Sequence, residues 1–279
     1  MGVTMLTLDT KQNRKVIYGK TMRLTRDLKT AITAHAQEEY PNECCGVIIG
    51  GQYHACTNIA TDRANAFEID PSELVALAEV GEVEAIVHSH PNGEPLPSEV
   101  DKVQMGLHGV DWVIVGLGKS PTGAEYCDIK THHPTMYQSP LLGREYHHGV
   151  QDCYTLVQDY YKRELGIDLP DFARVDEWWE NADHEPLYEN NFKKAGFEVV
   201  DGTPQKHDVI LCRVGRTHHV NHALVFVGDG KLQSENASDC VGDCLVLHHP
   251  HGRLSVREIY GESLQKRTAL VVRHKEFIK

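Results

Sequence analysis

Apolar positions in the first half of the chain alternate between helical and strand-like spacing. From Arg26 to Glu39 apolar residues recur on one helix face, and the breaker Pro41-Asn42 follows, so we expect a helix that ends in a loop. Other segments have the same helical spacing, or are short runs of β-branched and aromatic residues bounded by Gly, Pro or Asp. These predict helices at Pro71–Val80 and Glu99–His108, and strands at Gly46–Gly51, Ala85–Val87 and Trp112–Leu117. The first half is therefore expected to be a mixed α/β domain.

The pattern changes after residues 131–143, THHPTMYQSPLLG, which have two prolines and no sustained period. Such a segment is typical of an interdomain linker, and we place the boundary near residue 138. Beyond it, Asp152 is suited to cap a helix whose apolar face starts at Cys153. Strands are predicted late, at Asp208–Val214, His222–Val227 and Ala269–Val272. Helix first and sheet afterwards is the layout of a small α+β domain.

The predicted organisation is thus a polar N-terminal arm over residues 1–20, a first domain over 21–137 and a second over 138–279. A chain of 279 residues with 41% hydrophobic residues is long enough for two such cores. The formal charge of -12 argues against nucleic acid as a partner, because affinity for phosphates depends on Lys and Arg. Apolar runs fall far short of the roughly 20 residues that cross a bilayer, so no membrane insertion is expected.

The N-terminal sequence and the cysteines indicate where the chain resides. The first residues lack the apolar core of a secretory signal, so we expect synthesis in the cytoplasm. Eight irregularly spaced cysteines suit a reducing compartment. The 18 histidines are numerous, and neutral imidazole serves both metal binding and acid/base chemistry near pH 7. The question is which of them converge.

A metal site is predicted at the end of the strand that carries His88 and His90. These residues are two positions apart, so both side chains point to the same side of the strand. A pair of this kind is weak support among so many histidines. Ser98 and Asp101 follow at fixed spacing after Pro91, and that combination makes a chance match improbable.

The string His88-Ser-His90-Pro-x6-Ser98-x2-Asp101 resembles the signature of JAMM metallopeptidases. This resemblance implies that His88, His90 and Asp101 bind Zn²⁺. It also implies that Glu43, in Pro41-Asn-Glu43-Cys-Cys-Gly46, is the catalytic base and that Ser98 hydrogen-bonds the developing oxyanion. Two imidazoles and one carboxylate would leave a fourth position on the ion for water, as catalytic zinc requires. A base beside such a water could take its proton and pass it to the leaving amine.

A second catalytic group is predicted at Cys153, where free N–H groups at the start of a helix favour the thiolate. A cysteine on an apolar helix face is ordinarily part of the core, so a base is needed to support this hypothesis. His222 stands at the start of an apolar strand that ends in a Gly-Asp-Gly turn. Cysteine on a helix followed by histidine on a strand is the order of papain-like peptidases.

Gly149-x-x-Asp-Cys153, followed by His222-Ala-Leu-Val-Phe-x-Gly-x-Gly, resembles the NlpC-type peptidases, which cleave stem peptides of bacterial cell walls. The resemblance runs from about residue 140 to the end and implies Cys153 as nucleophile and His222 as base. Tyr146 would line the substrate cleft, although a buried tyrosine with a satisfied hydroxyl is an equally good interpretation.

The third residue of that site is where the sequence departs from the family. The usual spacing would select Ser234, but the segment around His248-His249 looks like the family's segment displaced by an insertion over residues 234–245. We expect His248, with His249 and Ser234 as alternatives. The insertion also carries Cys240-x3-Cys244-x3-His248, which could bind a metal or form a disulfide, but a solvated loop is favoured.

The two domains, joined by Pro-Leu-Leu-Gly-Arg-Glu-Tyr at residues 140–146, together resemble the tail tip assembly proteins of lambda-like siphophages. This implies a component of the distal tail that contacts other tail tip proteins, contributes to assembly and cleaves peptidoglycan peptides as the genome enters the host. It would occupy the host cytoplasm during assembly and then the virion tail tip. Two alternatives stay open: a protease that trims a tail protein during maturation, and a bacterial JAMM enzyme that processes a protein tail.

Overall fold

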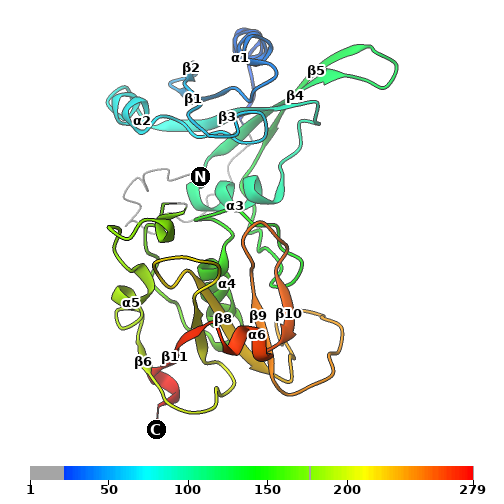
Figure 1. Ribbon diagram of the computed structural model, residues 1–279. Coiled ribbons are helices and arrows are strands. Elements are labelled where there is room, and N and C mark those ends of the chain that lie inside the picture. Colours follow the sequence, from blue (N-terminus) through cyan, green and yellow to red (C-terminus); the bar gives the residue numbers. More distant parts are fainter. Residues whose placement is uncertain (1–21, 176, 279) are drawn as a thin grey trace. The chain divides into compact units, whose positions relative to one another are not determined.

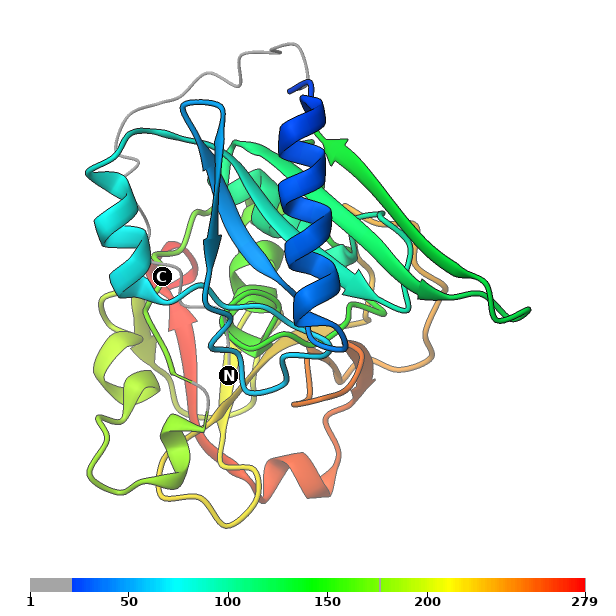
Figure 2. The same cartoon turned by 90° about the horizontal axis from the view of Figure 1, so that it is seen from above.

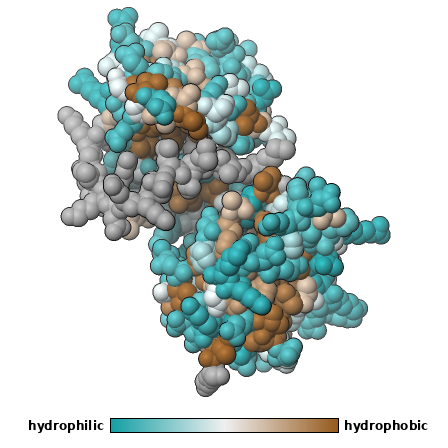
Figure 3. Space-filling view, turned by 90° about the vertical axis from the view of Figure 1, so that its left-hand side faces the viewer, coloured by the Kyte–Doolittle hydropathy of each residue, from teal (hydrophilic) through white to brown (hydrophobic). Residues whose placement is uncertain are grey.

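The computed structural model describes residues 22–175 and 177–278, which divide into two compact units, one ending at Gln138 and the other beginning at Ser139 (Figure 1). The N-terminal arm predicted over residues 1–20 lies outside the described residues. Apolar side chains on the face in Figure 3 form separate patches among polar ones. None of the helices in the described residues is long and apolar enough to cross a membrane.

The first unit is built on a five-stranded sheet with the order β2-β1-β3-β4-β5. Only β3 and β4 run parallel; every other neighbouring pair is antiparallel. The strands are β1 (Cys45–Ile49), β2 (Gln52–Cys56), β3 (Val83–Pro91), β4 (Asp111–Lys119) and β5 (Glu125–His132). The helices are α1 (Arg26–Glu39), α2 (Pro71–Ala78) and α3 (Glu99–His108).

Apolar clusters cover both faces of this sheet. Helix α1 lies across one face (Figure 2) and buries Leu28, Ile32 and Ala36 against it. On the other side, Met105 of α3 packs in a cluster with Trp112 of β4. Because β3 and β4 are parallel, the chain must cross over between them, and α3 makes that crossover. The end of β3 is therefore followed closely by the N-terminus of α3.

The second unit contains a six-stranded antiparallel sheet with the order β10-β9-β8-β7-β11-β6. Helix α4 (Cys153–Tyr160) packs on it, with Leu156 and Val157 in one apolar cluster with Val225 and Leu247. The strands are β6 (Phe197–Val199), β7 (Val209–Cys212), β8 (His222–Gly228), β9 (Leu245–His248), β10 (Val256–Ile259) and β11 (Thr268–His274). The shorter helical elements are η1 (Tyr161–Leu165), η2 (Trp178–Glu180), α5 (Leu187–Asn191), α6 (Glu262–Gln265) and η3 (Lys275–Phe277).

The predicted fold class, a mixed α/β domain followed by a small α+β domain, is confirmed. The predicted bounds of α1 and α3 agree with the structure, and the strands predicted around Ile86, Val115 and Val225 are present. The linker prediction was wrong at its start: β5 continues to His132, where it pairs with Trp112. This edge strand is mostly exposed and carries polar residues on both faces, so it has no apolar period to detect.

Two candidate active sites

His88, His90 and Asp101 converge at the junction of β3 and α3. The Nε2 atoms of the two histidines lie 2.9 Å apart. Carboxylate oxygens of Asp101 lie 3.5 Å from His88 Nε2 and 3.4 Å from His90 Nε2. Within the described part of the chain, this is the one group of three such side chains whose ligand atoms all lie within 4.8 Å of one another.

The tautomer of His90 suits a metal ligand. Its Nδ1 atom lies 3.0 Å from the carbonyl oxygen of Glu94, which can only accept, so Nδ1 carries the proton and Nε2 presents a lone pair to the group. His88 is buried, with its ring stacked on Phe67 at 4.6 Å and edge-on to Trp112 at 5.4 Å. Burial lowers the pKa of His88, which keeps the imidazole neutral. These donors fit Zn²⁺, which binds neutral imidazole and carboxylate.

Ser98 holds Asp101 in place through a reciprocal cap at the start of α3. The Ser98 hydroxyl accepts a hydrogen bond from the Asp101 N–H at 3.2 Å, and the Ser98 N–H donates to Asp101 Oδ2 at 2.8 Å. This pairing satisfies two backbone donors that a helix N-terminus otherwise leaves open.

Glu43 lies just before β1, at the same end of the sheet. Cys45 pairs with His88 and the Ser89 N–H donates to the Cys44 carbonyl at 3.2 Å, so continuing the register sets Glu43 opposite His90. Burial raises the pKa of Glu43 to about 8, while the charge of His90 acts to lower it and that of Asp101 to raise it. Glu43 is thus a buried carboxyl that feels the charges of the metal-site residues.

In the second unit, Cys153 is the first residue of α4. Asp152 caps the helix through hydrogen bonds from the N–H groups of Tyr154 and Thr155, at 3.0 and 2.9 Å. The Cys153 sulfur lies 3.1 Å from the hydroxyl of Tyr188 and also accepts a hydrogen bond from the backbone of Ala223, the residue after His222. Burial, and then the charge of Asp152, raises the pKa of Cys153 to about 11.

His222 is joined to His248 on the neighbouring strand. His222 Nε2 lies 2.8 Å from His248 Nδ1, and His248 Nε2 lies 2.9 Å from a carboxylate oxygen of Glu258. Burial lowers the pKa of His222 to about 3, and the charges of His248 and His249 act in the same direction. The structure therefore pairs His222 with His248, and it places the Cys153 sulfur against the backbone of Ala223, the residue after His222.

The two alternatives for the third residue lie elsewhere. Ser234 is exposed, and its N–H donates to Glu164 at 2.8 Å. His249 is buried against Tyr146, with 5.1 Å between ring centroids. Tyr146 itself lines the cavity that contains Cys153, and its hydroxyl lies 3.3 Å from His148 Nδ1. Neither Ser234 nor His249 has a contact with His222 comparable to that of His248.

The insertion is an irregular loop before β9 in which Cys240 and Cys244 are both free thiols. Sequence reasoning missed Arg174, Tyr188 and Glu258, because none belongs to a motif or a periodic segment. One signal was available: Trp178, Trp179 and Tyr188 follow one another within a short stretch, and clustered aromatic residues are common in ligand pockets.

Comparisons with known proteins agree with this division. Residues 25–127 match a family model described as prokaryotic homologs of the JAB domain, and residues 143–273 match the NlpC/P60 family. These matches confirm the predicted order of a JAMM-type domain followed by an NlpC-type domain.

Relatives cover most of the chain or a smaller part of it. The chain is 37% identical over 251 residues to tail tip assembly protein K of Escherichia phage N15, covering 88% of this chain and 93% of that protein. It is 35% identical over 208 residues to tail tip assembly protein K of Escherichia phage lambda, covering 74% and 89%. Over 121 residues it is 30% identical to a desampylase of Haloferax volcanii, covering 38% of this chain and 87% of that protein. The chain therefore belongs to the tail tip assembly protein K family of phages.

Proposed function

We propose that this protein is a tail tip hydrolase with two separate peptidase sites, and that the second site cleaves peptides of bacterial peptidoglycan when the genome enters the host. The observation that carries the proposal is the contact of His222 with His248, beside a Cys153 sulfur that accepts from the backbone of Ala223, in a domain that matches the NlpC/P60 family. The relatives' description as tail tip assembly proteins supports a role in assembly alongside other tail proteins. The protein would then act first in the host cytoplasm and later at the virion tail tip.

The second site would work by covalent catalysis. His222 takes the thiol proton of Cys153, and the thiolate attacks the carbonyl carbon of the scissile amide. His248 holds His222 Nε2, which leaves Nδ1 of His222 to face the reaction. As the C–N bond breaks, His222 returns the proton to the leaving amine. Water then hydrolyses the thioester, releasing a carboxylate and restoring the thiol.

The first site would be a zinc metallopeptidase in which His88, His90 and Asp101 hold the ion. Zinc bound there would acidify a water molecule and polarise the substrate carbonyl. Glu43 takes a proton and delivers it to the leaving amine, a task for which a pKa near neutrality is suited. Ser98, at the N-terminus of α3 next to the metal-site residues, would donate its hydroxyl proton to the developing oxyanion.

A second candidate function concerns the first site alone. The similarity to a desampylase covers 38% of this chain and 87% of that protein. This favours a protein substrate for the metal site, such as a tail protein trimmed during maturation. A bacterial enzyme that processes a protein tail fits less well, because it would leave the Cys153 site without a use.

The test is to assign the peptidase activity of the full chain to one of its two sites. Purified protein is incubated with peptidoglycan, and the released fragments are identified by mass spectrometry. Cys153→Ala should abolish release of stem-peptide fragments, because the covalent reaction needs the sulfur. A zinc chelator or Glu43→Gln should leave most of the release unchanged.

The opposite result, release that stops on chelation and survives Cys153→Ala, would make the first unit the wall hydrolase. The second unit would then be a binding or docking module. Presence of the chain in purified virions separates a wall hydrolase from a factor needed only during assembly.

A further inference from the structure

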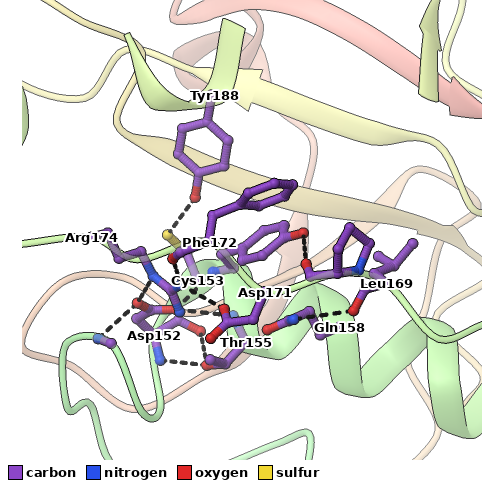
Figure 4. A network of polar contacts seen from close by, with 12 residues as sticks. Asp152, Cys153, Thr155, Gln158, Leu169, Asp171, Phe172, Arg174 and Tyr188 are labelled. Carbon is purple, nitrogen blue, oxygen red and sulfur yellow. Dashed lines mark hydrogen bonds and ion pairs between the residues drawn. The ribbon is translucent and has the colours of Figure 1, made fainter. Parts of the chain in front are cut away.

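One segment of the second unit, the crossing segment (residues 166–175 and 177–196), lies between η1 and β6 in the chain and is tied to helix α4. The Tyr154 hydroxyl donates to the Pro170 carbonyl at 2.6 Å, and the Gln158 amide donates to the Leu169 carbonyl at 3.3 Å. Figure 4 shows the second contact, between Gln158 of this helix and Leu169. The crossing segment is therefore fixed to the element that carries the nucleophile.

A stronger link joins this segment to the helix cap. Arg174 Nε lies 2.6 Å from Asp152 Oδ2, and Nη2 lies 3.1 Å from Oδ1 of the same carboxylate (Figure 4). Its Nη1 atom donates to Asp171 at 2.9 Å and to the Phe172 carbonyl at 2.7 Å. The guanidinium side chain is only 8% exposed. A bidentate contact of this kind fixes the orientation of the guanidinium as well as its distance from the carboxylate. It therefore sets the position of the crossing segment relative to Cys153.

Tyr188, on α5 of the crossing segment, points its hydroxyl at the nucleophile. The phenol oxygen lies 3.1 Å from the Cys153 sulfur (Figure 4). Its ring packs near Trp178 and Tyr154, at centroid distances of 6.2 and 6.4 Å. Burial raises the pKa of Tyr188 well above its usual value, so the phenol keeps its proton and remains a donor.

We propose that Tyr188 is a further catalytic residue of the second site, donating its phenol hydrogen bond to the Cys153 sulfur before attack and to the substrate's carbonyl oxygen after it. This inference rests on the proposed cysteine peptidase function. Tyr146, the tyrosine that the sequence marks, has its hydroxyl against His148 instead of the sulfur.

The reaction explains why a donor at this position is useful. When the thiolate attacks, a C–S bond forms and the electron pair of the C=O double bond moves onto oxygen. That oxyanion develops on a carbon bonded to the sulfur, so a donor within 3.1 Å of the sulfur can turn to it with little movement. The Cys153 N–H, at the first position of α4, has no acceptor within the helix. On collapse the oxygen reforms the double bond, and the phenol is unchanged.

The charged groups around Cys153 make a neutral donor valuable. Asp152 disfavours the thiolate, whereas Arg174 and the backbone of Ala223 favour it. On the strand side, His222 is buried beside His248 and His249, whose charges would oppose its protonation. Hydrogen bonding from Tyr188 stabilises the thiolate without adding a charge, which lowers the pKa of Cys153 against the effect of burial.

The experiment compares Tyr188→Phe with Tyr154→Phe in the full chain. The control also removes a tyrosine hydroxyl near this region, from a half-buried side chain, but that hydroxyl binds Pro170 and not the sulfur. Two reactions of Cys153 are followed across pH by mass spectrometry of its peptide. Alkylation by iodoacetamide requires the thiolate but forms no oxyanion. Acylation by p-nitrophenyl acetate requires the thiolate and also passes through an oxyanion.

We expect Tyr188→Phe to raise the apparent pKa of Cys153 and to slow alkylation at pH 7 by about tenfold, as expected for loss of one hydrogen bond to a charged group. Acylation should slow further, by roughly another 10²-fold, because the oxyanion donor is also lost. Tyr154→Phe should change neither rate by more than about twofold.

Faster alkylation in Tyr188→Phe would overturn the proposal, since the phenol would then only shield the sulfur. Equal slowing of both reactions would likewise overturn the oxyanion role. Neither measurement uses peptidoglycan, so the outcome is separate from that of the proposed function. If the parent chain releases no wall peptides, the wall substrate is refuted. If Tyr188→Phe is nevertheless acylated far more slowly than that parent, the role of Tyr188 is supported.

Discussion

His222 Nε2 and His248 Nδ1 lie 2.8 Å apart although the two residues are 26 positions apart in the chain. Because this contact fixes the imidazole that would activate Cys153, His248→Ala should lower the rate of peptide cleavage by about 10²-fold or more. The measurement is the rate of release of stem-peptide fragments.

Ser234→Ala is the matched control, because Ser234 occupies the usual spacing of the family but lies against Glu164. Its rate should stay within about twofold of the parent. Should Ser234→Ala prove the more damaging variant while both remain folded, His248 would not be the orienting residue.

The zinc content of variants distinguishes the metal ligands of the first unit from its catalytic base. We expect one Zn²⁺ per chain, lost in His88→Ala because two donors cannot replace the three that meet between β3 and α3. Glu43→Gln should retain the metal, since Glu43 is not in that group of donors. Zinc is measured by elemental analysis of dialysed protein, and full occupancy in His88→Ala would contradict the assignment.

Acid should loosen α4 through Asp152. Burial alone would raise the pKa of Asp152, but Arg174 prevails and the pKa is lowered to about 2 from 3.8. A lowered pKa in the folded state means that the unfolded state binds the proton more readily. The stabilisation of about 2 kcal/mol is therefore present above about pH 4 and is lost as the pH falls through 2.

Hydrogen exchange of the α4 amides measures this effect. Protection should fall between pH 4 and pH 2 in the parent, after correction for the intrinsic pH dependence of exchange. Asp152→Asn should remove that pH dependence and show weaker protection than the parent at pH 4, with the difference shrinking toward pH 2. An unchanged pH profile in Asp152→Asn would exclude the carboxylate as the cause.

Gly46 tests the packing of β1 against β2. An added Cβ would meet the His54 carbonyl oxygen and come within 2.7 Å of the Tyr53 ring, so Gly46→Ala should destabilise the first unit by about 1–3 kcal/mol. Gly106→Ala is the control: it lies on α3, its Cβ would have 3.6 Å to the Thr135 carbonyl, and it should stabilise by about 0.5–1 kcal/mol. Thermal unfolding of both variants checks the opposite signs.

The residues that could be predicted from the sequence are those fixed by short-range geometry. His88, His90, Ser98 and Asp101 lie on one strand and the first turn of the next helix, so their spacing alone brings them together. Likewise, an acidic cap directly before Cys153 marks a helix start without reference to the rest of the fold.

What could not be predicted depends on contacts between distant segments. Tyr188 is 35 positions from Cys153, and its helix of five residues carries no periodic pattern. The choice between Ser234 and His248 depends on the length of an irregular loop, which spacing cannot resolve. Strand β2 was not predicted because only Cys56 of its five residues is buried, and edge strands need little apolar sequence.

The division between Gln138 and Ser139 has a consequence for inheritance. Each site draws all of its named residues from one side of that point, so a genetic crossover there would cut through neither. Phage genomes could exchange the segment that encodes the first unit, or the one that encodes the second, with its site intact. Selection could then change the bond cut by one half while the other kept its chemistry.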